Sequence, residues 1–126
     1  MKGYLTNIEE DTLTNDDYRR VLFTGEHTQL VLMTIQPGDD IGREKHEGHD
    51  QFIRIESGTG ELLMDGRVQP VSDGSAFIIP SGIEHNVTNT SADEPLRLYT
   101  LYSPPEHPDG TVQRTKQDER SAKSQA

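Results

Sequence analysis

Apolar residues alternate with polar ones along most of the chain between Arg19 and Tyr102, and Gly, Pro, Asn or Asp interrupts this pattern at short intervals. A spacing of two places apolar side chains on one face of a β-strand, and the interruptions are typical of turns. No helical periodicity is evident in this region. The pattern therefore predicts short strands at Arg20–Thr24, Thr28–Gln36, Arg43–His46, Gln51–Ser57, Gly60–Met64, Arg67–Val71, Ala76–Ile79, His85–Asn89 and Leu96–Tyr102.

Turn sequences between these strands indicate how the strands connect. Asp65-Gly66 is a two-residue hairpin signal. Further corners are expected at Pro37-Gly38, Asp73-Gly74 and Pro80-Ser81-Gly82. Many short strands around one core favour an antiparallel sandwich or barrel of the jelly-roll type. We therefore expect an all-β fold with a single barrel over residues 19–102.

The two ends of the chain differ from this central region. Residues 1–18 are expected to form an N-terminal segment that is partly strand. Residues 103–126 form a Pro-rich and polar C-terminal tail, whose prolines cannot donate the ladder hydrogen bonds of a central strand. Within that tail, residues 113–126 are either mobile or a short helix held by its surroundings.

Charge and length narrow the range of partners. The 126 residues suffice for one domain at most. Lys and Arg number 12 against 22 Asp and Glu, which gives a net charge of −10, and the whole acidic surplus falls within residues 1–102. Such a surface repels phosphate backbones and anionic membranes. We therefore expect neither nucleic acid nor a membrane as a partner.

The absence of other signals excludes several functional classes. The chain has no cysteine, so any metal must be bound by nitrogen and oxygen ligands. The longest unbroken apolar run, Leu30–Met33, is too short for a signal sequence or a membrane span, which predicts a cytoplasmic protein. No phosphate-binding glycine loop, serine nucleophile elbow or basic stripe is present, which disfavours nucleotide hydrolysis, serine hydrolysis and nucleic-acid binding.

Candidate chemistry is concentrated between Glu44 and Gln51. In an extended segment, Glu44 and His46 share one face because they are two residues apart. In the next strand, Gln51 lies on the same inward face as Ile53 and Ile55. The four intervening residues, which include a glycine, suit a hairpin that brings Gln51 beside Glu44 and His46.

Two motifs of this sequence resemble the cupin family. The second cupin motif is Gly, five residues, Pro-x-Gly, two residues, His, three residues, Asn, and it is matched by Gly74, Pro80, Gly82, His85 and Asn89. The first motif contains His-x-His and a later Glu, but here Glu44 stands at the first His position and Gln51 at the Glu position. The resemblance covers residues 19–102 and implies a cupin barrel.

A narrower group within that family is also similar. Small bacterial cupins labelled mannose-6-phosphate-isomerase-like share the segments Ile41–His46, Asp50–Phe52 and Ser103–Val112. The resemblance implies that Glu44, His46, Gln51 and His85 bind one divalent metal ion, which could be Mn, Fe, Zn, Ni or Co. Two imidazoles and one carboxylate suit these ions and leave coordination positions open, whereas a neutral glutamine is a weak fourth ligand. Cupins often pair through outer faces, where Phe52 and Arg54 point, so a homodimer is expected.

The remaining histidines are expected to play no part in the site. His49 is a possible substitute ligand, but an exposed hairpin-loop residue is the favoured interpretation. His27 and His107 are most simply surface residues, and Glu47 and Asp50 need only be solvated loop charges.

Three hypotheses for function follow from the residues and the resemblance. The leading one is a metal-dependent isomerase, lyase or dioxygenase that acts on a small sugar-like or enolizable carbonyl substrate, with Glu44 as a weak candidate for the base. The alternative is a non-catalytic cupin that binds or senses a small sugar or carboxylate. The third is a barrel that has lost its metal and serves only as a structural remnant.

Overall fold

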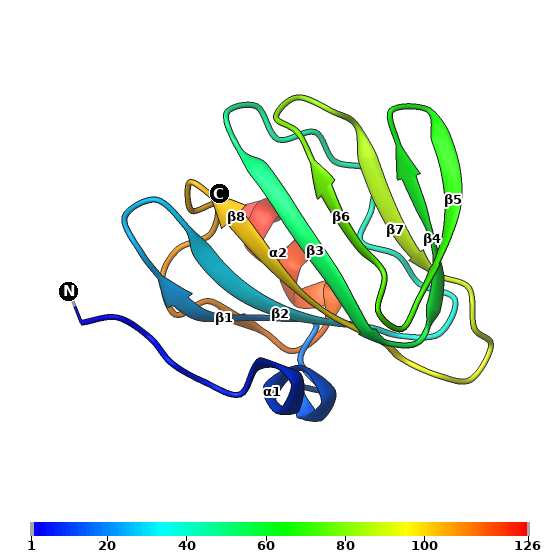
Figure 1. Ribbon diagram of the computed structural model, residues 1–126, viewed down its shortest axis with the longest axis horizontal. Helices are drawn as coiled ribbons and strands as arrows, with labels where there is room; N and C mark the ends of the chain where they lie inside the picture. Colours follow the sequence, from blue (N-terminus) through cyan, green and yellow to red (C-terminus); the bar gives the residue numbers. More distant parts are fainter. Residues whose placement is uncertain (1, 126) are drawn as a thin grey trace.

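The computed structural model describes the backbone of residues 2–125 and the side chains of residues 2–121. Two antiparallel sheets face each other, with strand orders β6-β3-β8-β2-β1-β9 and β5-β4-β7 (Figure 1). The strands are β1 (Arg19–Thr24), β2 (Gln29–Ile35), β3 (Asp50–Ser57), β4 (Thr59–Met64), β5 (Arg67–Ser72), β6 (Ala76–Ile79), β7 (His85–Asn89), β8 (Leu96–Ser103) and β9 (Val112–Gln113). This arrangement confirms the expected all-β barrel.

The core lies between the two sheets and consists of the inward residues of each strand. On β3, Gln51, Ile53 and Ile55 are buried while Phe52 and Arg54 are only partly so, as the alternation predicts. The expected hairpin at Asp65-Gly66 is present, with φ angles of 52° and 77°. Both residues lie in the left-handed region that such a two-residue turn requires.

One predicted strand is absent from the structure. Arg43–His46 does not form a continuous strand, and only Glu44 makes an isolated antiparallel bridge, to His85 of β7. Gly42 and Gly48 on either side have φ angles of 99° and 83°, which turn the backbone away from an extended path. The segment therefore follows the edge of β7 at one point rather than joining the sheet.

The N-terminal segment contains a helix where strand was partly expected. No strand is found in residues 2–18; α1 (Ile8–Thr14) occupies this stretch and packs on the outer side of the six-stranded sheet (Figure 1). The side chain of Asn7 caps it by accepting a hydrogen bond of 3.0 Å from the N–H of Glu10. Acidic residues in its first turn are favourable near the positive end of the helix dipole.

The C-terminal tail forms the helix that was one of the two alternatives for it. After β9 pairs with β1, the chain enters α2 (Lys116–Gln125). The side chain of Glu119 in this helix is buried against Arg19 of β1. Within the described residues, neither α1 nor α2 has the length or apolar character needed to cross a membrane.

An apolar row runs across the outer face of the six-stranded sheet. Strand register places Ile78 beside Phe52, Phe52 beside Leu101, Leu101 beside Leu30, and Leu30 beside Phe23. Ile78 is 62% exposed, and the other four side chains are partly buried. We refer to these five residues as the outer row.

Candidate metal centre

Three of the four predicted ligands meet inside the barrel. Potential ligand atoms of Glu44, His46 and His85 all lie within 4.8 Å of one another. Glu44 and His46 come from the connection between β2 and β3, and His85 begins β7 of the other sheet. The side chains are well shielded, because those of Glu44 and His46 are 16% and 15% exposed. The cluster therefore combines donors from separate segments in a protected position.

Backbone hydrogen bonds fix this cluster. Glu44 and His85 exchange two N–H···O=C bonds of 2.9 Å each, which align the two residues side by side. The carbonyl of His46 accepts a 3.0 Å hydrogen bond from the N–H of Gly82, in the turn that precedes β7. The glycine and proline of the second sequence motif thus belong to a turn that holds the loop of the first motif.

His85 is prepared to act as a ligand. Its Nδ1–H donates a 3.0 Å hydrogen bond to the carbonyl of Ile83, so Nε2 is left to coordinate an ion. The residue is 3% exposed, and this burial lowers the pKa of His85 below its usual value. The lowered pKa favours the neutral imidazole, which is the form that binds metals.

His46 lies directly beside Glu44. Nε2 of His46 lies 2.7 Å from Oε2 of Glu44. This hydrogen bond raises the pKa of His46 above its usual value, and the effect outweighs burial, which acts in the opposite direction. A divalent cation would compete with protons for these two atoms.

Gln51 fits the role of a fourth ligand. The residue is 4% exposed, and its Nε2 donates a 3.0 Å hydrogen bond to Oγ1 of Thr100. Its Oε1 is buried and has no hydrogen-bond partner among the described residues. A buried acceptor without a partner is costly. Coordination to a cation would satisfy this atom, so the donor set of two imidazoles, one carboxylate and one amide fits a divalent transition metal.

Sequence reasoning missed the surroundings of His49. This residue is not part of the three-residue cluster, but neither is it an exposed loop residue. Its side chain is only 20% exposed, and its Nε2 lies 3.0 Å from Oε2 of Glu106. Its Nδ1–H donates a 2.8 Å hydrogen bond to the carbonyl of Pro104. Glu106, which the sequence analysis did not single out, also approaches His46, at 3.6 Å from Nδ1.

His107 is not a simple surface residue either. Its ring packs edge-on against Tyr102, with 5.1 Å between centroids, and its Nε2 is buried. The ring of Tyr102 also packs edge-on against the ring of His46, with 5.9 Å between the centroids. The Pro-rich stretch after β8 therefore lies beside the site, and its similarity to the C-terminal segment of small cupins was the available signal. His27 is exposed, as expected.

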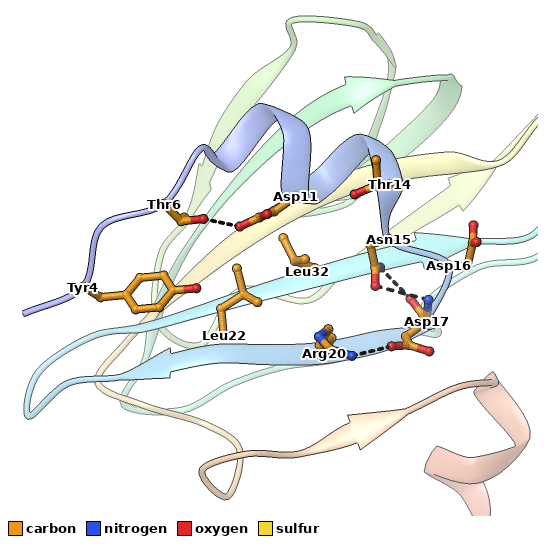
Figure 2. A pocket seen from close by; sticks show the side chains of 10 residues that line it. All are labelled: Tyr4, Thr6, Asp11, Thr14, Asn15, Asp16, Asp17, Arg20, Leu22 and Leu32. Carbon is orange, nitrogen blue, oxygen red and sulfur yellow. Dashed lines mark hydrogen bonds and ion pairs between the residues drawn. The ribbon is translucent and has the colours of Figure 1, made fainter.

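A separate groove of about 570 Å³ lies outside the barrel, between α1 and the outer side of β1 and β2 (Figure 2). Its charged side chains are already paired. Arg20 contacts Asp17 at 3.2 Å, and Asp11 accepts a hydrogen bond from Thr6 (Figure 2). None of the three metal-cluster residues lines this groove. The groove therefore lies where α1 and the N-terminal segment pack against the sheet.

Comparison with known proteins agrees with the barrel fold. Residues 31–102 match the family described as Cupin domain. The crystal structure of BH2720 from Bacillus halodurans superposes with a TM-score of 0.91 and 44% sequence identity, covering 95% of both chains. YrkC from Bacillus subtilis (strain 168) is 44% identical over 93% of this chain. The match spans 66% of that relative's own length.

A more distant relative carries a name that refers to a ligand. The oxalate-binding protein of Thermotoga maritima is 31% identical over 61 residues. This match covers 48% of the present chain and 50% of the relative.

Proposed function

Because this chain belongs to the cupin family, we propose that it binds one divalent metal ion and uses it to act on a small sugar-like or enolizable carbonyl compound. The proposed ligands are Glu44, His46, Gln51 and His85. The observation that carries the proposal is the close approach of three ligand side chains within 4.8 Å. The buried, unpartnered Oε1 of Gln51 supports it independently.

The donor set supports metal-assisted carbonyl chemistry. Two neutral imidazoles, one carboxylate and one amide would leave a divalent ion with a net charge of about +1. Four protein donors also leave coordination positions open on Mn, Fe, Co or Ni. When bound, such an ion supplies Lewis-acid polarisation of a carbonyl or alkoxide oxygen. The proposed reaction is an isomerase, lyase or dioxygenase reaction, and the mannose-6-phosphate-isomerase-like type is one of these.

The chain's own residues have distinct parts in this proposal. His85 is oriented by its hydrogen bond to the carbonyl of Ile83, and burial lowers the pKa of His85, which favours the neutral form that would bind the ion. His46 and Glu44, whose Nε2 and Oε2 atoms lie 2.7 Å apart, would hold the ion together. Glu44 is the candidate base because it is the one carboxylate among the proposed ligands. The ring of Tyr102 packs edge-on against His46, and the ring of His107 packs edge-on against Tyr102.

A second candidate function is the binding of a small carboxylate without turnover. The name of the Thermotoga maritima relative favours this candidate, because carboxylates bind readily to a cation with open positions. Ligand retention without conversion, across sugars, sugar acids and small dicarboxylates, would support a binding protein. Isomer formation or oxygen uptake that is lost in His46→Ala and His85→Ala would support the enzyme.

Metal analysis of the purified protein tests the shared premise. We expect about one divalent ion per chain in the wild type and its loss in His46→Ala and His85→Ala. His27→Ala is the matched control, because this histidine is 87% exposed and is not one of the three residues of the cluster. A wild-type protein that contains no metal and takes up no added Mn²⁺, Fe²⁺ or Zn²⁺ would contradict the proposal and favour a structural remnant.

We further propose that the chain forms a homodimer through the outer row. Five apolar side chains in register cross five neighbouring strands, and Ile78 at one end is 62% exposed. An exposed apolar patch is typical of an interface, and the row offers one at Ile78, whereas Phe23 at the other end stacks on Tyr4 with 5.2 Å between ring centroids. In a two-fold dimer the same patch of each subunit meets its own copy. The outer row of one subunit would therefore pack against the outer row of the other.

A further inference from the structure

The segment that follows β8 is attached firmly to the barrel wall by Gln29. This glutamine of β2 is fully buried. Its Oε1 accepts hydrogen bonds from the N–H groups of Glu106 and His107, at 3.2 and 3.0 Å, and its Nε2 donates one of 2.7 Å to the carbonyl of His107. A buried amide that uses both of its ends in this way holds a segment in one position.

This attachment places the carboxylate of Glu106 between two histidines. Oε1 lies 3.6 Å from Nδ1 of His46, and Oε2 lies 3.0 Å from Nε2 of His49. His49 is held in turn by its hydrogen bond to the carbonyl of Pro104. The side chain of Glu106 is 26% exposed, so its charge is only partly screened by water.

We propose that Glu106 is a positioning residue for the metal centre, with His49 as its anchor. The carboxylate faces the Nδ1 edge of His46, on the side of the ring opposite the Nε2 that meets Glu44. It therefore favours the orientation in which Nε2 is presented to the cluster. This inference rests on the proposed metal binding and assigns a role to residues outside the ligand set.

The physical basis is the response of an imidazole to a coordinated cation. A cation draws electron density from the ring and makes its distal N–H more positive. A carboxylate beside that N–H stabilises the loaded state and restrains the ring. Glu106 is outside the group of three residues whose ligand atoms lie within 4.8 Å. Its effect on the ion is therefore exerted through His46.

Titration of the chelator-treated protein with Mn²⁺ tests this role by a binding measurement that needs no substrate. We expect Glu106→Gln to weaken Mn²⁺ binding about 10- to 100-fold, the range typical for loss of an outer carboxylate partner. Glu61→Gln is the matched control, because Glu61 is exposed on β4 of the other sheet, and its affinity should equal that of the wild type. The thermal unfolding midpoint of metal-free Glu106→Gln should remain near that of the wild type.

A second variant separates positioning from a general loss of structure. His49→Gln should weaken Mn²⁺ binding in the same direction, and the double variant should be no weaker than Glu106→Gln, because the two residues act as one unit. The absorption bands of bound Co²⁺ should also change in Glu106→Gln, since they report the geometry of the ligands. Equal Mn²⁺ affinity in Glu106→Gln and the wild type would overturn the inference. A wild type that binds no Mn²⁺, Zn²⁺ or Co²⁺ would instead overturn the proposed function.

Discussion

Glu44 and His85 are joined by two backbone hydrogen bonds of 2.9 Å, one in each direction. This pair connects a loop to the first residue of β7, so the two side chains leave the backbone from neighbouring positions before any ion is present. The cluster is thus set by the backbone of two separate segments. Because these side chains are already held in place, less conformational entropy is lost when an ion binds.

The glutamine in the ligand set can be tested by restoring a carboxylate. Gln51→Glu should bind divalent ions about tenfold or more tightly, because an anionic oxygen replaces a neutral one at the ion. Competition with a chelator of known affinity measures the change. Gln69→Glu adds the same charge at an exposed position on β5 and serves as the control. Unchanged affinity in Gln51→Glu would mean that Oε1 of Gln51 does not face the ion.

The buried ion pair between α2 and β1 should matter for stability. Arg19 and Glu119 are 1% and 6% exposed, and the pair joins segments from opposite ends of the chain. Glu119→Gln should lower the free energy of unfolding by about 3–5 kcal/mol, because it leaves a buried guanidinium without its counter-charge. Urea unfolding followed by circular dichroism measures this value.

Two further variants test whether the lost free energy of unfolding in Glu119→Gln comes from the unpaired buried charge. Replacing both partners, in Arg19→Met with Glu119→Leu, should recover much of the stability, since neither buried charge remains. Asp17→Asn removes the pair with Arg20, whose side chain is 51% exposed, and should cost less than about 1 kcal/mol. An equally small loss in Glu119→Gln would show that α2 does not depend on this contact.

A pH-dependent contribution is expected from Asp40. The hydrogen bond from Lys116 lowers the pKa of the Asp40 carboxyl below its ordinary value of 3.8. The ionised carboxyl therefore stabilises the folded state above pH 3.8, and this contribution is lost as the pH falls further through the lowered value. Because the Asp40 side chain is 37% exposed, the effect is expected to be below about 1 kcal/mol.

Comparing the wild type with Asp40→Asn measures this contribution. The difference in unfolding free energy should be present at pH 7 and pH 5 and should shrink gradually as the pH falls from 4 to 2. Asp65→Asn is the control, because Asp65 is an exposed turn residue and asparagine also tolerates its positive φ. Asp73→Asn would not serve, because the Asp73 carboxylate accepts a hydrogen bond from the N–H of Gly58. A difference that stays constant from pH 7 to pH 2 would contradict the prediction.

The outer row predicts the oligomeric state. Phe52→Asp places a charge in the middle of this apolar surface and should convert a dimer to a monomer without unfolding the chain. Light scattering after size-exclusion chromatography measures the mass directly. Val68→Asp, at a residue that is 61% exposed on the other sheet, should leave the dimer intact. A wild type that is monomeric at high micromolar concentration would contradict the homodimer.

The amino-acid sequence by itself predicted most of the strands and the residues of the proposed ligand set. Alternation assigned Gln51 to the inward face of β3, and the spacing around His85 identified the second motif and the turn that precedes β7. Both are local properties, because the period of a strand and the residues of a turn are written in consecutive positions. The sequence also pointed to the segment around Glu44, but it predicted a strand there, whereas the structure has only an isolated bridge.

The tertiary structure decided which distant residues meet. Alternation states which face a side chain occupies but not what lies opposite, so the approach of Glu106 to His46 and His49 was not evident. That approach depends on the path of a proline-containing segment, which Gln29 fixes from another strand. Likewise, Glu119 became buried only because α2 returns to Arg19 at the start of the barrel. Contacts between residues so far apart in the chain depend on packing, which a one-dimensional pattern does not record.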